Sequence, residues 1–283
     1  MSDLLLDISD KIDFNYINAL NEVKKNADLL GIPFFIVGAS ARDFILQHYH
    51  GIPSTRMTTD IDLGILVSNW KQFDKMIDVL IKTGKFIKSK ESQRISFENV
   101  LIDLMPFGPI SGEDNRISWP PEHQFIMNML GFKKAYENSI MIKLSSSPDL
   151  VVRVASLPGV VILKLLSWND KYPDRGKDAE DLLFIMKNYD YSDNLNRLYD
   201  EESALLQEEG FDCTIAGIRL LGRDIAKISN AEMLKTIKKI LSDETDEKSQ
   251  YKLISQMIIP LGDSFDRILG MLNKLKQGIL DNC

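Results

Sequence analysis

Residues 34–63 decide the fold of this chain: the stretch begins with FFIVGASARD and ends with TTDIDL. Its apolar start predicts a strand, and the small residues that follow predict a turn that opens a helix. A second strand then carries two aspartates, Asp60 and Asp62, one residue apart. Because side chains alternate between the faces of a strand, both carboxylates point to one face, while Ile61 and Leu63 point into the core.

The turn and the carboxylate pair are chemically complementary. Two adjacent carboxylates repel each other, and a divalent cation such as Mg²⁺, which prefers hard oxygen ligands, removes that repulsion. The turn at Gly38, Ala39 and Ser40 offers free backbone N–H groups at the positive end of a helix dipole, which favours phosphate. A phosphate cradle followed by a metal-binding pair suits the binding of a nucleoside triphosphate.

Each feature also has an ordinary structural explanation. Triplets such as Gly-Ala-Ser often form simple turns, and surface strands often carry alternating charge. The order of the two features and their closeness in the sequence favour the functional interpretation, because a motif is judged by its context.

A second informative segment is VVILKLLSW at residues 160–168, which is apolar almost all round and predicts a buried helix. Lys164 is its one ionisable residue. A buried lysine needs a partner, and we expect Lys164 to meet a phosphate; the alternative is a side chain that reaches the surface. Further on, DRGKDAEDL at residues 174–182 places Asp178 and Asp181 on one helix face.

Together these segments resemble a known family. Gly-Ala-Ser on a strand–helix turn, followed by Arg-x-Thr-x-Asp-Ile-Asp-Leu at residues 56–63, is similar to the DNA polymerase β-type nucleotidyltransferase superfamily. Lys-Leu followed by Arg-x-Lys-Asp-x-x-Asp-Leu at residues 175–182 resembles its AbiEii branch, the toxin nucleotidyltransferases of type IV toxin–antitoxin systems. The resemblance covers residues 34–186. The usual small pair of the superfamily is Gly-Ser or Gly-Gly, whereas Ala39 separates Gly38 from Ser40 here.

A third carboxylate is expected on a neighbouring strand. Apolar residues alternate over residues 95–97 and 100–104, which predicts a hairpin that turns at residues 98–99 and puts Asp103 on the face opposite its apolar neighbours. The superfamily has a carboxylate beside its Asp-x-Asp pair, and Asp103 matches that position by chain order. The alternative is a solvent-facing aspartate; the functional interpretation is favoured because the strand is otherwise apolar.

The resemblance implies a role for each matching residue. Asp60, Asp62 and Asp103 would hold Mg²⁺, with two ions expected. Lys164 would neutralise the triphosphate, and Asp178 would orient the acceptor or Lys164. The implied catalytic residues are Asp60, Asp62, Lys164 and Asp178. The residues expected to contact the nucleotide are Gly38, Ala39, Ser40, Arg56, Thr59, Arg175 and Lys177.

The composition sets further limits. With 283 residues, 44% hydrophobic and 27% charged, the chain can bury one large core or two modest ones. It has no long uncharged apolar run and no basic segment before its first apolar residues, so we expect no membrane span and no secretory signal. Cys213 and Cys283 lie far apart, which suggests a reducing compartment, and we expect a cytoplasmic protein. At a net charge of −7, any nucleic-acid site must be a local basic patch.

The pattern of elements predicts an α+β fold in two domains. Residues 1–188 are expected to form a nucleotidyltransferase domain with a mixed β-sheet flanked by helices, as the resemblance implies. Residues 189–283 show apolar residues at helical spacing and no strand alternation, so they are expected to form a helical C-terminal domain. Most of its scattered lysines and arginines are expected on the solvated surface, and the alternative is that a subset forms a groove wall for RNA.

Three functions remain open at this point. The first is a Mg²⁺-dependent enzyme that moves a nucleoside monophosphate from a nucleoside triphosphate to an acceptor hydroxyl and releases pyrophosphate. For this enzyme, the resemblance implies an RNA acceptor such as a tRNA 3′ end, and an antitoxin partner. The second function is the same transfer to a small molecule or a protein. The third is a non-catalytic nucleotide-binding or interaction module, against which the intact carboxylate set argues. The choice among ATP, GTP, CTP and UTP is open.

Overall fold

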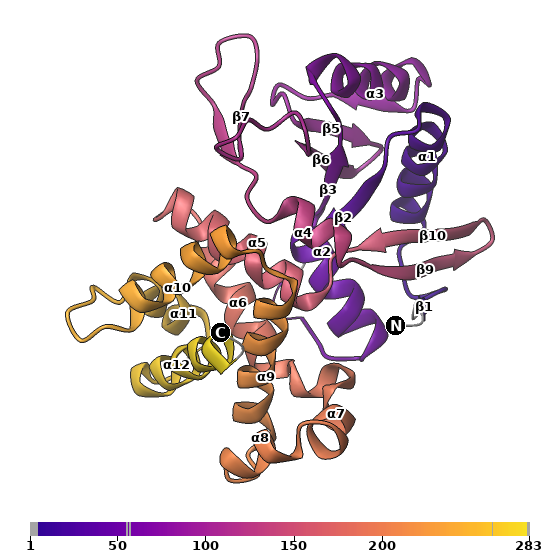
Figure 1. Ribbon diagram of the computed structural model, residues 1–283. Helices are drawn as coiled ribbons and strands as arrows, with labels where there is room; N and C mark the ends of the chain where they lie inside the picture. Colours follow the sequence, from indigo (N-terminus) through magenta and orange to yellow (C-terminus); the bar gives the residue numbers. More distant parts are fainter. Residues whose placement is uncertain (1–4, 55, 57, 262, 282–283) are drawn as a thin grey trace. The chain divides into compact units, whose positions relative to one another are not determined.

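The chain divides into two compact units, Met1–Ser156 and Leu157–Cys283 (Figure 1). The computed structural model describes residues 5–54, 56, 58–261 and 263–281. The division falls earlier than the boundary expected at residue 188. The reason is that helices α5 (Leu157–Lys171) and α6 (Gly176–Asn188) pack against each other and against later helices of the second unit.

The first unit is built on a mixed eight-stranded sheet with the strand order β1-β9-β10-β2-β3-β6-β5-β4. In that order the strands are Leu5–Asp7, Ile140–Ser146, Asp149–Val154, Phe34–Val37, Asp60–Leu66, Val100–Phe107, Arg94–Phe97 and Phe86–Lys88. The central strand β3 runs antiparallel to β2 and parallel to β6. A separate small hairpin joins β7 (Arg116–Ser118) to β8 (Ile126–Asn128).

Helices with clear end signals surround this sheet. Helix α1 (Phe14–Leu30) starts where the Asp13 carboxylate accepts a hydrogen bond from the backbone of Asn15, and it ends at a left-handed Gly31. It packs on β6, β10 and α3 (Trp70–Lys82). Helix α2 (Gly38–Asp43) begins directly after β2 and continues into the π-helix η1 (Phe44–Tyr49), where an ordinary helix was expected.

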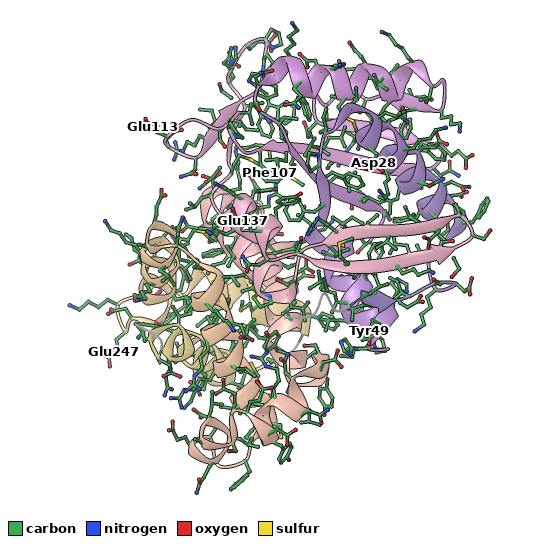
Figure 2. The ribbon with its side chains drawn as sticks, turned by 45° about the vertical axis from the view of Figure 1, so that its right-hand side comes forward. Asp28, Tyr49, Phe107, Glu113, Glu137 and Glu247 are labelled. Atoms are coloured by element: carbon green, nitrogen blue, oxygen red, sulfur yellow. The ribbon has the colours of Figure 1, made fainter. Side chains whose placement is uncertain are left out.

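An aromatic cluster closes one face of the sheet. The rings of Phe35 and Phe107 lie in edge contact over Gly64, and both contact Phe132 and Tyr136 of helix α4 (Phe132–Glu137). Figure 2 shows Phe107 in the interior and Glu113 at the surface of the unit. Phe35 and Phe107 are fully buried, so the cluster contributes to the core beside the later half of β3.

The second unit is entirely helical over its described residues. After α5 and α6 come η2 (Asp190–Asn194), α7 (Leu195–Asp200), α8 (Ser203–Glu208), α9 (Cys213–Ile228), α10 (Ala231–Thr245), α11 (Lys252–Leu261) and α12 (Phe265–Asp281). Helices α9 and α12 approach closely through Gly222 and Gly278: a Cβ at Gly278 would lie 1.9 Å from the carbonyl oxygen of Arg219. No side chain fits between the two backbones there.

The predicted fold class is confirmed: a mixed sheet flanked by helices is followed by a helical C-terminal part. The hairpin at residues 98–99 forms as expected between β5 and β6. None of the described helices is long and apolar enough to cross a membrane. Cys213 is a free thiol, and Cys283 lies outside the described residues.

Candidate active site

The turn at the start of α2 packs against the carboxylate of Asp62. Gly38 has a φ of 66°, and a Cβ at this position would lie 2.0 Å from Asp62 Oδ2, so a residue other than glycine would be strained and would clash. Ala39 and Ser40 are buried. The Ser40 hydroxyl donates a 2.9 Å hydrogen bond to the carbonyl oxygen of Asp60. The predicted phosphate turn therefore lies directly beside the aspartate pair.

The three predicted metal-binding carboxylates share one face of the sheet. Asp62 on β3 is the register partner of Asp103 on β6, and Asp60 precedes Asp62 by two residues. Ile61 and Leu63 are fully buried on the other face, as the alternation predicted. The side chain of Asp60 is 38% exposed and that of Asp103 is 15% exposed, so the cluster is accessible at the Asp60 end.

Arg94 lies across this cluster, and the sequence analysis did not single it out. Arg94 lies on β5 and is the register partner of Asp103 on β6. It donates two hydrogen bonds of 2.7 Å to Asp103, from Nε to Oδ1 and from Nη2 to Oδ2. Its Nη2 also lies 3.7 Å from Oδ2 of Asp60. The Asp103 carboxylate, which accepts these hydrogen bonds, raises the pKa of Arg94, which remains charged. One cation thus compensates two of the three carboxylates.

The donor set is chemically suited to a divalent cation. Asp60, Asp62 and Asp103 offer hard carboxylate oxygens on neighbouring strands, the ligands that Mg²⁺ prefers. Gly38 leaves room for the Asp62 carboxylate against the turn. Within the part of the chain that the structure describes, no three His, Cys, Asp or Glu side chains already converge as a metal site. Instead, the guanidinium of Arg94 donates hydrogen bonds to both carboxylate oxygens of Asp103.

A buried arginine fixes the loop that leads into β3. Arg42 is fully buried, donating from Nε to Asp43 over 2.7 Å and from Nη2 to Ser54 Oγ over 3.0 Å. The Thr58 hydroxyl donates to the second carboxylate oxygen of Asp43 over 2.5 Å. The segment just before Asp60 is therefore tied to α2. Sequence reasoning missed this pair, although an Arg-Asp dipeptide inside a buried helix is itself a signal.

Two residues of the same loop were expected to contact the nucleotide. Thr59 is exposed at the start of β3. Arg56 is half-buried, and its carbonyl oxygen accepts a 2.8 Å hydrogen bond from Ser54. Both precede the aspartate pair directly, and their contact with a nucleotide stays a prediction.

In the second unit, Lys164 is buried and carries two carboxylate partners. Its Nζ lies 2.8 Å from Asp178 Oδ1 and 2.6 Å from Asp181 Oδ2. Burial would lower the pKa of Lys164, but the two carboxylates outweigh burial and hold the pKa above its ordinary value. The alternative of a lysine that reaches the surface is wrong, because the residue is 8% exposed.

One carboxylate oxygen of Asp178 accepts no hydrogen bond from the described residues. Its Oδ1 accepts from Lys164, while its Oδ2 is buried and has no hydrogen-bond partner among the described residues. The Nε of Arg175 lies 3.9 Å from that oxygen. Arg175 and Lys177 are exposed at the start of α6. An unsatisfied buried carboxylate oxygen is costly in a purely structural ion pair, so it marks Asp178 as a candidate functional group.

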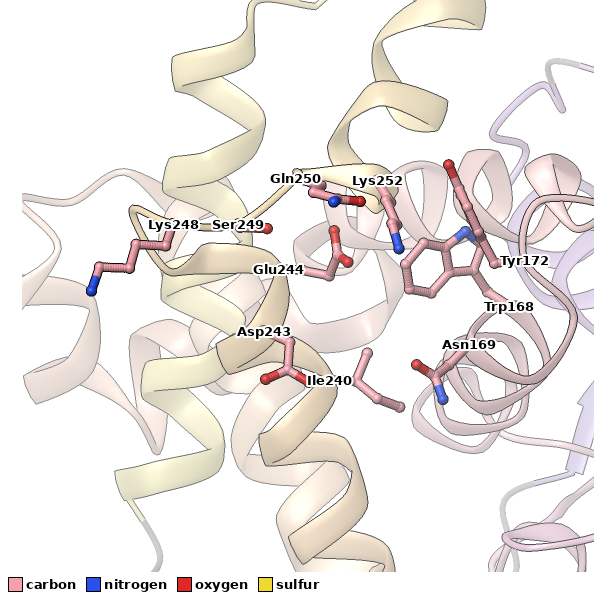
Figure 3. A pocket seen from close by; sticks show the side chains of 10 residues that line it. All are labelled: Trp168, Asn169, Tyr172, Ile240, Asp243, Glu244, Lys248, Ser249, Gln250 and Lys252. Atoms are coloured by element: carbon pink, nitrogen blue, oxygen red, sulfur yellow. The ribbon is translucent and has the colours of Figure 1, made fainter.

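A cavity of about 480 Å³ lies elsewhere in the second unit, between the end of α5 and the α10–α11 connection (Figure 3). Glu244 and Lys252 face it, together with Trp168 and Tyr172. Trp168 is only 2% exposed, so little of its ring is accessible for stacking, and its indole N–H donates to Gln256 over 2.7 Å. None of the predicted site residues lines this cavity.

Several solved structures are distantly similar to the chain. The antibiotic-resistance factor ANT(2'')-Ia in solution has 13% identity and a TM-score of 0.36, over 71% of this chain and 99% of that one. A CCA-adding enzyme with ATP has 15% identity and a TM-score of 0.32, over 96% of this chain and 82% of that one. An antigenic nucleotidyltransferase-like protein from Paracoccidioides brasiliensis has 16% identity and a TM-score of 0.38, over 60% of this chain and 74% of that one. No curated protein matches the chain.

The family of the chain follows from a match to a family model. The model described as nucleotidyl transferase AbiEii toxin, type IV TA system, matches residues 28–270 and so spans most of both units. The matched region includes the turn at Gly38, the carboxylate cluster and the Lys164 ion pairs. The chain therefore belongs to the AbiEii family of nucleotidyl transferase toxins of type IV toxin–antitoxin systems.

Proposed function

We propose that this protein transfers a nucleoside monophosphate from a nucleoside triphosphate to a hydroxyl at the end of an RNA, in a reaction that requires Mg²⁺. The observation that carries the proposal is the packing of the Gly38 turn directly against the Asp60–Asp62 pair. A phosphate-binding turn and a metal-binding pair in contact suit a triphosphate whose charge is shared by both. The family also implies an antitoxin partner.

In this mechanism the chain positions the reacting groups. Asp60 and Asp62 would provide the oxygen ligands for Mg²⁺, with Asp103 beside them. The ion would supply Lewis acidity, which would favour ionisation of the acceptor hydroxyl and stabilise charge on the leaving pyrophosphate. The backbone N–H groups of the Gly38 turn hold phosphate oxygens, while the Ser40 hydroxyl keeps the turn in place on β3.

We assign the acceptor side of the reaction to Asp178. Its Oδ2, which accepts no hydrogen bond from the described residues, would accept a hydrogen bond, or a proton, from the acceptor hydroxyl. Lys164 holds the other oxygen and so orients the carboxylate, and Asp181 helps to keep Lys164 charged. Arg175 and Lys177 are exposed cations that would contact phosphates of the nucleotide or the acceptor.

Incubation with each nucleoside triphosphate, radiolabelled on its α-phosphate, together with Mg²⁺, total RNA and a cell extract tests the proposal. We expect label in RNA, no label when EDTA is present, and loss of transfer in Asp62→Asn. Label in protein or in small molecules would overturn the RNA acceptor while keeping the transferase. Absence of label with all four nucleotides would contradict nucleotidyl transfer itself.

A further inference from the structure

Arg94 is placed where a metal ion would otherwise neutralise the carboxylate cluster. Its guanidinium donates to both oxygens of Asp103 over 2.7 Å, and it lies 3.7 Å from Asp60. Fork-shaped pairs of this kind are among the stronger charge-assisted hydrogen bonds, and guanidinium keeps its charge at any working pH. The side chains are only 27% and 15% exposed for Arg94 and Asp103, so solvent screens the pair incompletely.

A divalent cation on Asp103 and the guanidinium of Arg94 on the same carboxylate repel each other and compete for its negative charge. Both oxygens of Asp103 are already engaged, and an ion bound to either would lie close to a second positive charge. The strand register places Arg94 directly opposite Asp103, so its side chain stays within reach of the cluster. A divalent ion therefore binds Asp103 more tightly once the side chain of Arg94 has moved away.

We propose that Arg94 is the resident counter-cation of the metal-free cluster, and that a divalent cation binds by displacing its guanidinium from Asp103 and Asp60. This inference rests on the proposed function, since it concerns the metal of the same reaction. It makes Arg94 a positioning residue that lowers the affinity of the free protein for the cation. The ion is then taken up mainly together with the triphosphate, whose phosphate oxygens add ligands and negative charge.

The test is direct titration of the nucleotide-free protein with Mn²⁺, followed by electron paramagnetic resonance of the unbound ion. We expect Arg94→Gln, which keeps the length but not the charge, to bind Mn²⁺ about tenfold or more tightly than wild type. The same variant should melt at a lower temperature without metal, because the carboxylates lose their counter-charge, and should gain more from added Mn²⁺. Arg94→Lys keeps the charge without the fork and should bind with intermediate affinity.

Arg116→Gln is the matched control, since it removes an exposed arginine of the same unit that lies on β7, outside the large sheet. It should bind Mn²⁺ as wild type does. Unchanged or weaker binding in Arg94→Gln overturns the inference, and if that variant does not fold, wild-type affinity in Arg94→Lys overturns it equally. Wild-type protein that binds no Mn²⁺ even with a triphosphate present would instead contradict the proposed function.

Discussion

Gly38 is the residue at which backbone conformation and site chemistry depend on each other most closely. Its φ of 66° is unfavourable for any other residue, and its Cβ position is taken by the carboxylate of Asp62. Gly38→Ala should therefore displace Asp62 in addition to straining the turn. We expect transfer to fall to background and the free energy of unfolding to fall by more than about 2 kcal/mol, measured by nucleotide transfer and urea melts.

Gly84 provides the control for this prediction. It has a similar φ of 73°, but no atom lies within 4 Å of its Cβ position. Gly84→Ala should thus show the backbone strain alone, about 1–2 kcal/mol, with normal transfer. Equal loss of transfer in both variants would mean that strain, rather than the contact with Asp62, explains the effect.

Lys164 is expected to matter for stability as much as for catalysis. The lysine was first expected to meet a phosphate, but its ammonium is already shared by Asp178 and Asp181. Lys164→Met would remove the ammonium that two buried carboxylates share, which should lower the free energy of unfolding by about 3–5 kcal/mol in urea melts. Asp178→Asn, which keeps the Lys164–Asp181 pair, should abolish transfer at little cost in stability. Normal transfer in Asp178→Asn would refute its catalytic role.

The sign of the pH dependence at Lys164 follows from its raised pKa. A lysine whose pKa is higher in the folded state contributes stability that is fully present below its ordinary value of 10.5. That contribution is lost as the pH rises through the folded-state pKa. The stability difference between wild type and Lys164→Met should therefore persist at neutral pH and shrink in strongly alkaline buffer.

The pairing of Arg94 with Asp103 follows from the predicted hairpin, although the sequence analysis did not single out Arg94. The hairpin turn at residues 98–99 was predicted, and a two-residue turn fixes the register of both strands. Counting back from that turn places Arg94 opposite Asp103, as observed. By contrast, Ser54, which accepts from Arg42, and Thr58, which donates to Asp43, come from an irregular loop whose path no periodicity in the sequence specifies.

At the scale of elements, periodic patterns predicted well where one face is buried. Strand β3 alternates accessible and buried residues over residues 60–63 as its sequence indicated, and α5 is buried nearly all round. The short strands β7 and β8 fell in a stretch rich in Gly, Pro and Ser, where alternation is too brief to detect. The unit to which α5 and α6 belong depends on packing partners distant in sequence, which local patterns do not reveal.

The close crossing of α9 and α12 gives a prediction within a single helix. Gly270 and Gly278 both lie in α12, but a Cβ at Gly270 meets nothing within 4 Å, while one at Gly278 lies 1.9 Å from Arg219. Gly270→Ala should stabilise the protein by about 0.5–1 kcal/mol through helix propensity. Gly278→Ala should destabilise it by about 1–3 kcal/mol through overpacking. Melts that shift in the same direction for both variants would contradict this crossing.

At the scale of the whole molecule, composition bounded the class of protein without identifying the site. The net charge of −7 gives no hint of an RNA acceptor, and the family was inferred from two short motifs more than a hundred residues apart. The metal and the triphosphate are expected to act together, because Arg94 already balances part of the carboxylate charge in the protein alone. A ligand test on the intact chain should therefore use both.

Thermal melts with Mg²⁺ and a non-hydrolysable triphosphate analogue provide that test. A ligand that binds the folded state alone, at about 100 times its Kd, stabilises it by about 2.7 kcal/mol, which raises Tm by a few degrees in a chain of this size. The increase should be larger than the sum of those with Mg²⁺ alone and with the analogue alone. It should disappear in Asp62→Asn, whereas Arg116→Gln should keep it. A full increase in EDTA would show that the turn binds the triphosphate without the carboxylates. No increase with analogues of all four nucleotides would favour a module that has lost nucleotide binding.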